Sequence, residues 1–414
     1  MLTTIQALLS LRLFRFAARP MARLVARLGR SGLAVGFCFG LSAWAGVALA
    51  QHPSSGLVGP DGSLPAFHAQ LREQMDFSLG WTAAQQKQPQ AWRAAGLQKA
   101  RELMLQPGQD ATPFQPQVIG EQDRGSYVAR QIEFNVTAHS RVLAWMLVPK
   151  GAGPFPAVLV LHDHGARFDI GKEKLIAPEA GSARAESAQQ WADKYFSGRF
   201  VGDALAQRGY VVLAVDALGW GDRSAPGFQA SSQQALAANL MNLGTSFASI
   251  IATEDVRAAR FLASQAEVDP RRVAALGFSM GAFRAWQVAA LSDDIAAAVA
   301  VNWMATVQGL MVPGNNQLKG QSAYAMLHPH LVRYLDYPDV AALAAPKPLL
   351  LYAGEQDALF PLPSVQAAFT RMRAVWSAFG ADRRLQTRTW PLGHVFVKEQ
   401  QEAAFDWLDA QLAR

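Results

Sequence analysis

The chain has 414 residues, of which 50% are hydrophobic and 17% are charged, with 33 glycines and 22 prolines. This composition excludes a disordered chain, a collagen-like repeat and a small disulfide-stapled protein. The net charge of +6 comes from residues 1–50, which hold six arginines and no lysine or acid; the remainder has 32 basic and 32 acidic residues. Residues 51–414 therefore have no net charge and no excess of basic residues to bind the phosphates of DNA or RNA, so we expect no nucleic-acid partner. The only cysteine, Cys38, lies within residues 1–50, so we expect no disulfide or thiol chemistry after them.

Those first 50 residues have the pattern of an export signal. Arginines continue as far as Arg30, residues 31–50 are apolar and uncharged, and a small-x-small triplet ends at Ala50. No twin-arginine pair precedes the apolar run, so we expect Sec-type export with cleavage after Ala50, giving a periplasmic or secreted protein without stable membrane insertion. An uncleaved membrane anchor is the alternative, and the sequence leaves open whether translation starts at Met1 or Met21.

A helical extension is expected before the main domain. Residues 51–60 are rich in proline, glycine and serine, as in linkers, and apolar residues then recur at spacings of three or four between residues 65 and 106. We therefore assign residues 51–124 to a linker and a helical N-terminal extension. Trp81 and Trp92 fall in it and are expected to pack in the core, as most buried tryptophans do.

From residue 125 onward, short apolar runs alternate with helical stretches. This rhythm predicts an α/β domain over residues 125–414, with a mostly parallel twisted sheet covered by helices on both faces. Strands are expected at 127–134, 142–148, 157–161, 210–215, 273–276, 296–301, 348–352 and 385–390. Two long segments, at about 165–197 and 302–345, do not follow this alternation of strands and helices. They are expected as insertions after strand ends, where the ligand sites of open α/β sheets gather.

One motif indicates a nucleophile. The sequence Gly277-Phe-Ser279-Met-Gly281 matches G-x-S-x-G, with an apolar strand before it and an alanine-rich helix after it. This turn holds the serine in a strained backbone conformation, and the flanking glycines let strand and helix approach closely. The helix N-terminus then directs free N–H groups at developing negative charge. An ordinary β–α turn with an incidental serine is the alternative.

A serine nucleophile needs a base, and the base needs a carboxylate to orient it. In folds with this motif the chain order is serine, acid, histidine. Asp357 follows the strand expected at 348–352 and is preferred over Glu355, which directly abuts the strand end. His394 follows the last expected strand, whereas His328 and His330 lie in the second insertion and are interpreted as packing residues.

An oxyanion hole needs two N–H donors. One is expected from Met280, directly after the serine, and the other from the loop His162-Asp-His164-Gly165 that follows the third strand of the pattern. A His-x-His pair also suggests a metal site, but no further histidine or cysteine cluster is placed to complete it, so we expect no metal. No phosphate-binding or dinucleotide motif occurs, so we expect no cofactor.

These residues resemble the α/β-hydrolase superfamily, and more narrowly the bacterial dienelactone-hydrolase-like and acetyl-xylan-esterase-like hydrolases. The likeness rests on GFSMG, GEQDALFP and PLGH with LHDHGA upstream, and on segments 161–174, 210–223, 267–282 and 330–361. It implies Ser279 as nucleophile, His394 as base and Asp357 as its orienting acid. It further implies the backbone N–H groups of Met280 and His164 as oxyanion donors.

The sequence departs from the group at some positions. Many members carry glycine after the second glycine of the motif, where this chain has Ala282, and the oxyanion loop reads HDHG rather than HG or HGG. The peptidase relatives favour a Ser-Tyr-Gly-Gly turn and a propeller domain, and this chain has neither. A peptidase activity is therefore disfavoured.

The leading interpretation is an exported serine esterase that hydrolyses short-chain, most simply acetyl, esters through an acyl-enzyme, with a carbohydrate ester as substrate by analogy. His162, Trp220 and Trp303 are candidate substrate contacts; burial of the tryptophans is the alternative. A dienelactone or lactone hydrolase, a thioesterase or an amidase would use the same residues, and a non-catalytic binding protein of this fold is a further alternative. The sequence does not indicate an oligomeric state.

Overall fold

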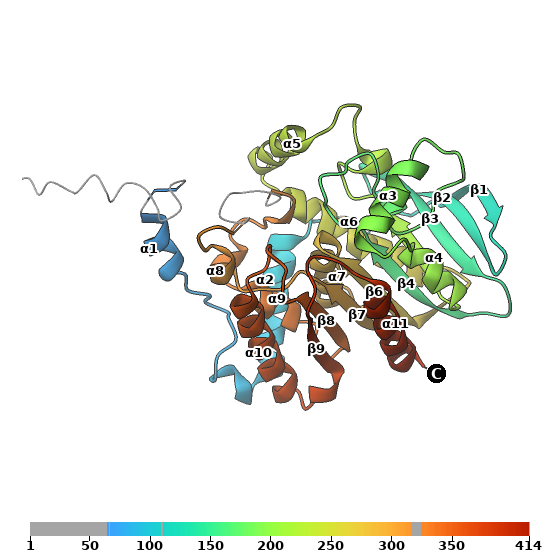
Figure 1. Ribbon diagram of the computed structural model, residues 1–414. Coiled ribbons are helices and arrows are strands. Elements are labelled where there is room, and N and C mark those ends of the chain that lie inside the picture. The colour runs from blue at the N-terminus through green and yellow to red at the C-terminus, as the bar shows by residue number, and fades with distance from the viewer. Residues whose placement is uncertain (1–63, 66, 109–110, 316–323, 414) are drawn as a thin grey trace, which may run out of the picture. The chain divides into compact units, whose positions relative to one another are not determined.

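The computed structural model describes residues 64–413 apart from 66, 109–110 and 316–323. The predicted export signal, with Cys38, therefore lies outside the described residues. A nine-stranded sheet runs through the domain in the order β1-β2-β3-β5-β4-β6-β7-β8-β9 (Figure 1). The strands are β1 Gln117–Asp123, β2 Tyr127–Thr137, β3 Ser140–Pro149, β4 Phe155–Leu161, β5 Val211–Val215, β6 Val268–Phe278, β7 Ala297–Val301, β8 Leu349–Gly354 and β9 Leu385–Trp390.

The sheet is antiparallel at one end and parallel through the rest. β1, β2, β3 and β5 pair antiparallel, while β5, β4, β6, β7, β8 and β9 pair parallel. In the parallel part the carboxyl ends of all strands meet at one edge, which is where loops collect ligand-binding residues. The predicted α/β-hydrolase fold with a mostly parallel sheet is confirmed.

Helices cover both faces because the central strands are apolar on both sides. Odd-numbered residues such as Leu159 and Leu213 belong to one core cluster, and their even-numbered neighbours Val158 and Val212 belong to the other. The helices are α1 Phe67–Glu73, α2 Pro89–Met104, α3 Ala185–Tyr195, α4 Val201–Gln207, α5 Ala230–Asn242, α6 Phe247–Ala263, α7 Met280–Leu291, α8 Val307–Leu310, α9 Tyr337–Ala342, α10 Leu362–Ala378 and α11 Lys398–Leu412. Helices α2, α6, α7, α9 and α10 pack on the first cluster, and α3, α4 and α11 on the second.

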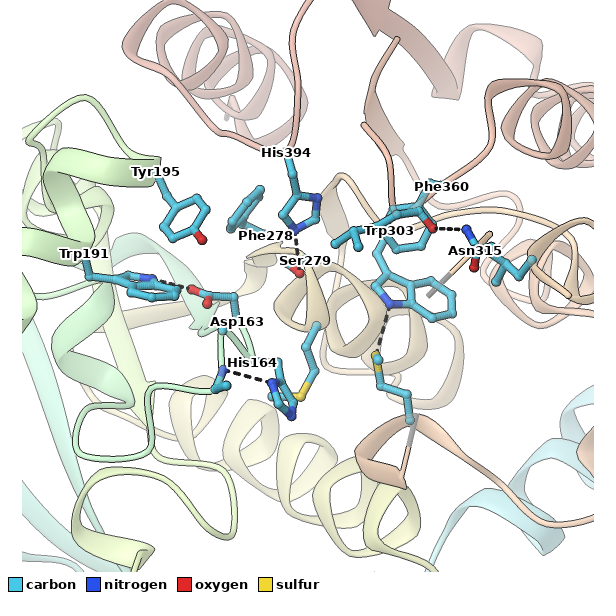
Figure 2. Close-up of a pocket in the computed structure, with 16 residues that line it drawn as sticks. Asp163, His164, Trp191, Tyr195, Phe278, Ser279, Trp303, Asn315, Phe360 and His394 are labelled. Atoms are coloured by element: carbon cyan, nitrogen blue, oxygen red, sulfur yellow. Dashed lines mark hydrogen bonds between the residues drawn. The ribbon is translucent and has the colours of Figure 1, made fainter. Parts of the chain in front are cut away.

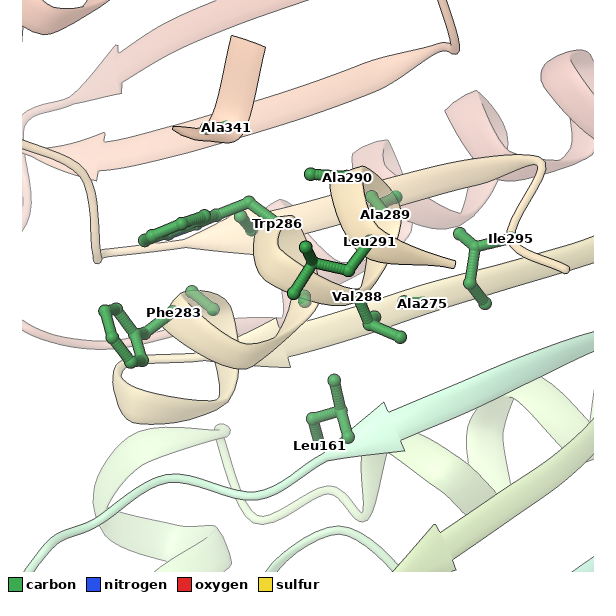
Figure 3. Packing of buried hydrophobic residues seen from close by; sticks show 14 of the residues in the cluster. Leu161, Ala275, Phe283, Trp286, Val288, Ala289, Ala290, Leu291, Ile295 and Ala341 are labelled. Atoms are coloured by element: carbon green, nitrogen blue, oxygen red, sulfur yellow. The ribbon is translucent and has the colours of Figure 1, made fainter. Parts of the chain in front are cut away.

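Helix α7, which follows the serine motif, lies at the centre of the first cluster. All of its residues are buried, and Figure 3 shows Phe283, Trp286 and Leu291 packed among neighbouring elements, with Leu161 of β4 on one side and Ala341 of α9 on another. A helix buried on every side is enclosed by its neighbours, and its one charged residue, Arg284, is paired with Asp255 of α6. Its surroundings therefore fix the position of its N-terminus.

The expected helical extension carries a pair of packed tryptophans and is hydrogen-bonded to the second insertion. Trp81 and Trp92 meet edge to face with ring centroids 4.8 Å apart, and both are buried, as predicted. Trp92 donates its indole N–H to the carbonyl of Leu79 at 2.8 Å, and Arg93 donates to the carbonyl of Leu343 in the second insertion at 2.8 Å. The extension thus contacts the insertion directly.

The domain boundary expected at residue 125 is misplaced. Strand β1 already belongs to the sheet and pairs with β2, yet its residues fall in the segment assigned to the helical extension. It is an edge strand whose residues are exposed or half-buried. It therefore lacks the alternation of apolar and polar residues by which a half-buried strand is recognised in a sequence. Helix α5 lies inside the connection after β5, and its sequence has little apolar periodicity.

Among the described residues, no single helix is long and apolar enough to span a membrane; α5 and α6 pass that test only as a pair bent by 87°.

Candidate active site

Ser279 lies in the turn between β6 and α7, with backbone angles φ 54° and ψ −125°. A non-glycine residue is strained there, and such strain persists only where surrounding structure enforces it. Ser279 donates its backbone N–H to the carbonyl of Val301 on β7 at 2.8 Å. A Cβ on Gly277 would lie 2.0 Å from the carbonyl oxygen of Gly281, and one on Gly281 would lie 1.9 Å from that of Leu161. Only glycine fits at these two positions.

His394 and Asp357 complete a row of hydrogen bonds that starts at the serine. Nε2 of His394 lies 2.8 Å from Oγ of Ser279, and its Nδ1 lies 2.6 Å from Oδ2 of Asp357. An ionised carboxylate only accepts hydrogen bonds, so Nδ1 carries the proton and Nε2 is free to accept the serine proton. The other carboxylate oxygen, Oδ1, accepts the N–H of Leu359 at 2.9 Å. The structure thus brings the three predicted side chains together in the expected order.

The alternative acid, Glu355, points elsewhere. Its Oε1 accepts the hydroxyl of Thr389 at 2.7 Å on the exposed side of the sheet edge. The alternative histidines are also remote from the serine: His328 is buried beside Gln287, and burial lowers its pKa to about 3. His330 precedes a short 3₁₀ turn in the left-handed conformation. Both histidines belong to the second insertion, as expected.

The loop that carries His394 is fixed by two features of neighbouring strands. Asn302, directly after β7, donates its amide to the carbonyl of Val395 at 3.0 Å. At the end of β8, a Cβ on Gly354 would lie 2.5 Å from the carbonyl oxygens of Leu392 and Gly393. The glycine of the GEQD motif therefore lets the histidine loop lie directly against the strand end.

A cavity of about 180 Å³ opens beside the serine. Figure 2 shows Ser279 and His394 between two walls. One wall comes from the oxyanion loop and the first insertion and carries Asp163, Trp191 and Tyr195. The other comes mainly from the second insertion and the loop after β8, and its members are chiefly apolar: Trp303, Leu310, Asn315, Met326, Leu359 and Phe360. The two insertions found in the sequence therefore build opposite sides of one cavity.

The predicted oxyanion donors lie at this cavity. Met280 is the first residue of α7, and the first N–H groups of a helix have no partner within it. His164 also lines the cavity. Its Nδ1 accepts the N–H of Ala166 at 3.1 Å, so Nε2 is the protonated nitrogen and donates to Oε1 of Gln233 on α5 at 2.8 Å. Burial lowers the pKa of His164 to about 4, which keeps the ring neutral.

Two predicted substrate contacts are corrected by the structure. His162, in the loop after β4, and Trp220, in the connection after β5, are fully buried and do not line the cavity. Nε2 of His162 accepts the N–H of Ala217 at 3.0 Å, and Trp220 donates its indole N–H to the carbonyl of His164 at 3.1 Å. Both side chains support the loop from behind. Trp303, the third candidate, does line the cavity.

Sequence reasoning missed Trp191 and Tyr195, which line the cavity from α3. They are the aromatic residues of a helix inside the first insertion, and that position was the only available signal. All four ring nitrogens of the His-x-His pair take part in hydrogen bonds; the remaining one, Nδ1 of His162, lies 2.9 Å from the carbonyl oxygen of Asp163. Within the described ranges, no group of three histidine, cysteine, aspartate or glutamate side chains is arranged to hold a metal ion.

Comparison with known proteins agrees with this fold. Residues 51–375 match the sequence model of the Abhydrolase family. YtaP of Bacillus subtilis (strain 168), provisionally named a hydrolase, is 28% identical over 273 residues, covering 66% of this chain and 84% of YtaP. A protein of Bacteroides fragilis NCTC 9343, provisionally named an acetyl xylan esterase, has a similar structure with a TM-score of 0.64 at 17% identity, covering 78% of this chain and 81% of that one.

A glucuronoyl esterase of Teredinibacter turnerae T7901 also has a similar structure, with a TM-score of 0.56 at 16% identity, covering 79% of this chain and 86% of that one. At these identities the structural likeness establishes the fold.

The glycines of the serine turn give a test of the packing. Gly277→Ala and Gly281→Ala place a Cβ against backbone atoms that cannot move aside, so we expect each to lower the free energy of unfolding by more than about 3 kcal/mol. Gly393→Ala, at the same site, is the control: its Cβ would lie 3.8 Å from the nearest atom, and we expect less than about 1 kcal/mol. Urea unfolding measures both, and equal losses would contradict the close-approach argument.

Proposed function

The chain belongs to the Abhydrolase family, and on that premise we propose that it is a serine esterase that works through an acyl-enzyme. The observation that carries the proposal is the row of hydrogen bonds from Ser279 through His394 to Asp357, placed at a cavity. A serine hydroxyl becomes nucleophilic when an oriented imidazole takes its proton. These three residues supply that arrangement without a cofactor.

In the proposed reaction, Oγ of Ser279 attacks the ester carbonyl carbon while Nε2 of His394 takes the hydroxyl proton. The carbonyl oxygen becomes an oxyanion, which the N–H groups of Met280 and the loop after β4 stabilise. The intermediate collapses, the C–O bond to the alcohol breaks, and His394 returns its proton to the leaving alcohol. Water then attacks the acyl-serine by the same steps and releases the acid. Asp357 orients the imidazole and stabilises its charged form.

We propose small acyl groups, most simply acetyl. The cavity of about 180 Å³ is small, and its wall of Trp303, Leu310, Met326 and Phe360 is suited to a short hydrocarbon group. The opposite wall offers the hydroxyl of Tyr195 and the ring of Trp191, which suit a hydroxylated alcohol such as a sugar. With an apolar wall for the acyl group and a more polar wall for the alcohol, the cavity favours an acetylated carbohydrate, in which the sugar is the alcohol. In a sugar-acid ester the sugar would be the acyl group and would meet the apolar wall.

The mechanism is tested by hydrolysis of p-nitrophenyl acetate. We expect the wild-type chain to hydrolyse it, Ser279→Ala to lower kcat at least about 10³-fold, and Asp357→Asn to lower it by a comparable factor because the histidine loses its orienting acid. Glu355→Gln, two residues from Asp357, is the control and is expected to keep kcat. Activity that survives in Ser279→Ala would refute the assignment of the nucleophile.

The substrate class is tested with acetylated xylo-oligosaccharides, a glucuronate benzyl ester, a lactone, a thioester and an anilide. Release of acetate at the highest kcat/KM supports the proposal. If another compound has the highest kcat/KM, its class is the substrate class in place of acetyl esters. A folded wild-type protein that hydrolyses none of them would favour a binding protein.

Chain-length preference follows from the apolar wall. Trp303→Ala enlarges the cavity where the acyl group is placed, so we expect kcat/KM for p-nitrophenyl octanoate relative to acetate to rise at least about 10-fold. Trp286→Phe is the matched control, since Trp286 packs against Trp303 with centroids 5.9 Å apart but does not line the cavity. An unchanged ratio in Trp303→Ala would place the acyl group elsewhere.

Export from the cell remains part of the proposal and rests on the sequence of residues 1–50. We expect expression of the full chain in a Gram-negative host to give a periplasmic protein that starts at Gln51, and deletion of residues 1–50 to leave the protein in the cytoplasm. Cell fractionation with N-terminal sequencing measures both. A full-length chain retained in the membrane fraction would establish the uncleaved anchor.

A further inference from the structure

A buried lysine lies directly behind the proposed oxyanion loop. Lys174 ends the 3₁₀ turn Lys172–Lys174 in the first insertion and is fully buried. Its ammonium group donates to two successive backbone carbonyls, those of Asp163 and His164, each at 2.9 Å. It also lies 3.7 Å from Oδ1 of Asp163 and 4.9 Å from the ring centre of Trp191. A buried ammonium with these partners is costly to desolvate, so its position calls for a physical explanation.

The two carbonyl contacts determine where the following N–H groups point. In a trans peptide the N–H of one residue points opposite to the carbonyl of the residue before it. The carbonyls of Asp163 and His164 are drawn toward Lys174, so the N–H groups of His164 and Gly165 point away from it. His164 and Gly165 line the cavity together with Ser279, whereas Lys174 does not. The two N–H groups therefore lie on the side of the loop opposite Lys174, which is the side that the proposal below assigns to the cavity.

Other buried contacts hold the same loop in this orientation. The carbonyl of His164 accepts a second hydrogen bond from the indole of Trp220, and the carbonyl of His162 accepts one from Arg284 of α7 at 3.2 Å. Trp191 donates to Oδ2 of Asp163 at 3.0 Å, which keeps that carboxylate beside the lysine. Lys174 is the one of these donors that binds two consecutive carbonyls.

We propose that Lys174 is a positioning residue for the oxyanion hole. It turns the N–H groups of His164 and Gly165 toward the ester carbonyl. Its positive charge also stabilises the negative charge that forms on the carbonyl oxygen in the transition state. This stabilisation acts on the transition state, in which the oxyanion exists, and not on the bound substrate, so it changes kcat rather than KM. This inference rests on the proposed esterase function and adds to it a residue that touches no substrate atom.

The chain offers a matched control in the same turn. Lys172 is also buried, but its ammonium faces Asp216, Glu173 and Asp222 rather than the oxyanion loop. Substitution of either lysine removes a buried charge and leaves acids without their partner, so both variants lose stability. Only the substitution of Lys174 releases the two loop carbonyls.

The experiment compares Lys174→Met with Lys172→Met in the full mature chain, residues 51–414, using p-nitrophenyl acetate and thermal unfolding. For Lys174→Met we expect kcat per folded molecule to fall about 100-fold while KM changes less than about 3-fold, as when one oxyanion donor is lost. For Lys172→Met we expect a similar or larger fall in Tm with kcat within about 3-fold of the wild type. Equal losses of kcat in the two variants, or a loss confined to KM, would overturn the proposal.

A second variant decides the question if Lys174→Met does not fold. Trp220→Phe keeps an aromatic ring at this position, although a smaller one, and removes the second donor to the carbonyl of His164. We expect kcat to fall about 3- to 10-fold at unchanged KM, and an unchanged kcat would overturn the anchoring argument. Failure of the esterase proposal itself is recognised separately, because then the wild type is inert or Ser279→Ala is active, whatever the lysine variants do.

Discussion

The structure depends on the close approach of three backbones at the end of the sheet. Gly277 and Gly281 lie almost in contact across the turn of Ser279, and Gly281 in turn lies against the carbonyl of Leu161. Leu161 is the last residue of β4, and the loop with the proposed oxyanion donors begins directly after it. One steric constraint therefore sets the nucleophile and that loop relative to each other, and no side chain could be added at the contact without separating them.

Buried charges hold the rest of the loop, and they do so at a cost. Arg284 on α7 binds both carboxylate oxygens of Asp255 on α6, at 2.9 and 2.7 Å, and also reaches the carbonyl of His162. Lys174 approaches the next two carbonyls from the first insertion. Apolar residues could fill this volume with a smaller desolvation penalty, but they could not orient peptide groups. The position of these charges beneath the loop is consistent with a need for one fixed backbone geometry.

The predictions that the structure corrects share a physical origin. His162 and Trp220 are candidate substrate contacts in the sequence because they lie in segments expected at the rim of the site, yet both face the interior. The roles of Trp191 and Lys174 depend on how the first insertion folds back onto the loop after β4: the indole of Trp191 meets Asp163, 28 residues away, and Lys174 meets the carbonyls of Asp163 and His164. Strand β1 was missed because an exposed edge strand carries little hydrophobic signal.

The sequence alone determined the α/β class, the positions of the central strands and the candidates Ser279, Asp357 and His394. These follow from local patterns: buried parallel strands are continuously apolar, and a serine turn must be flanked by residues without side chains. Only the tertiary structure decided which side chains line the cavity, that both insertions contribute to it, and that Lys174 lies behind the oxyanion loop. Those properties depend on the direction in which each loop leaves the sheet, and that direction is set by packing between segments far apart in the chain.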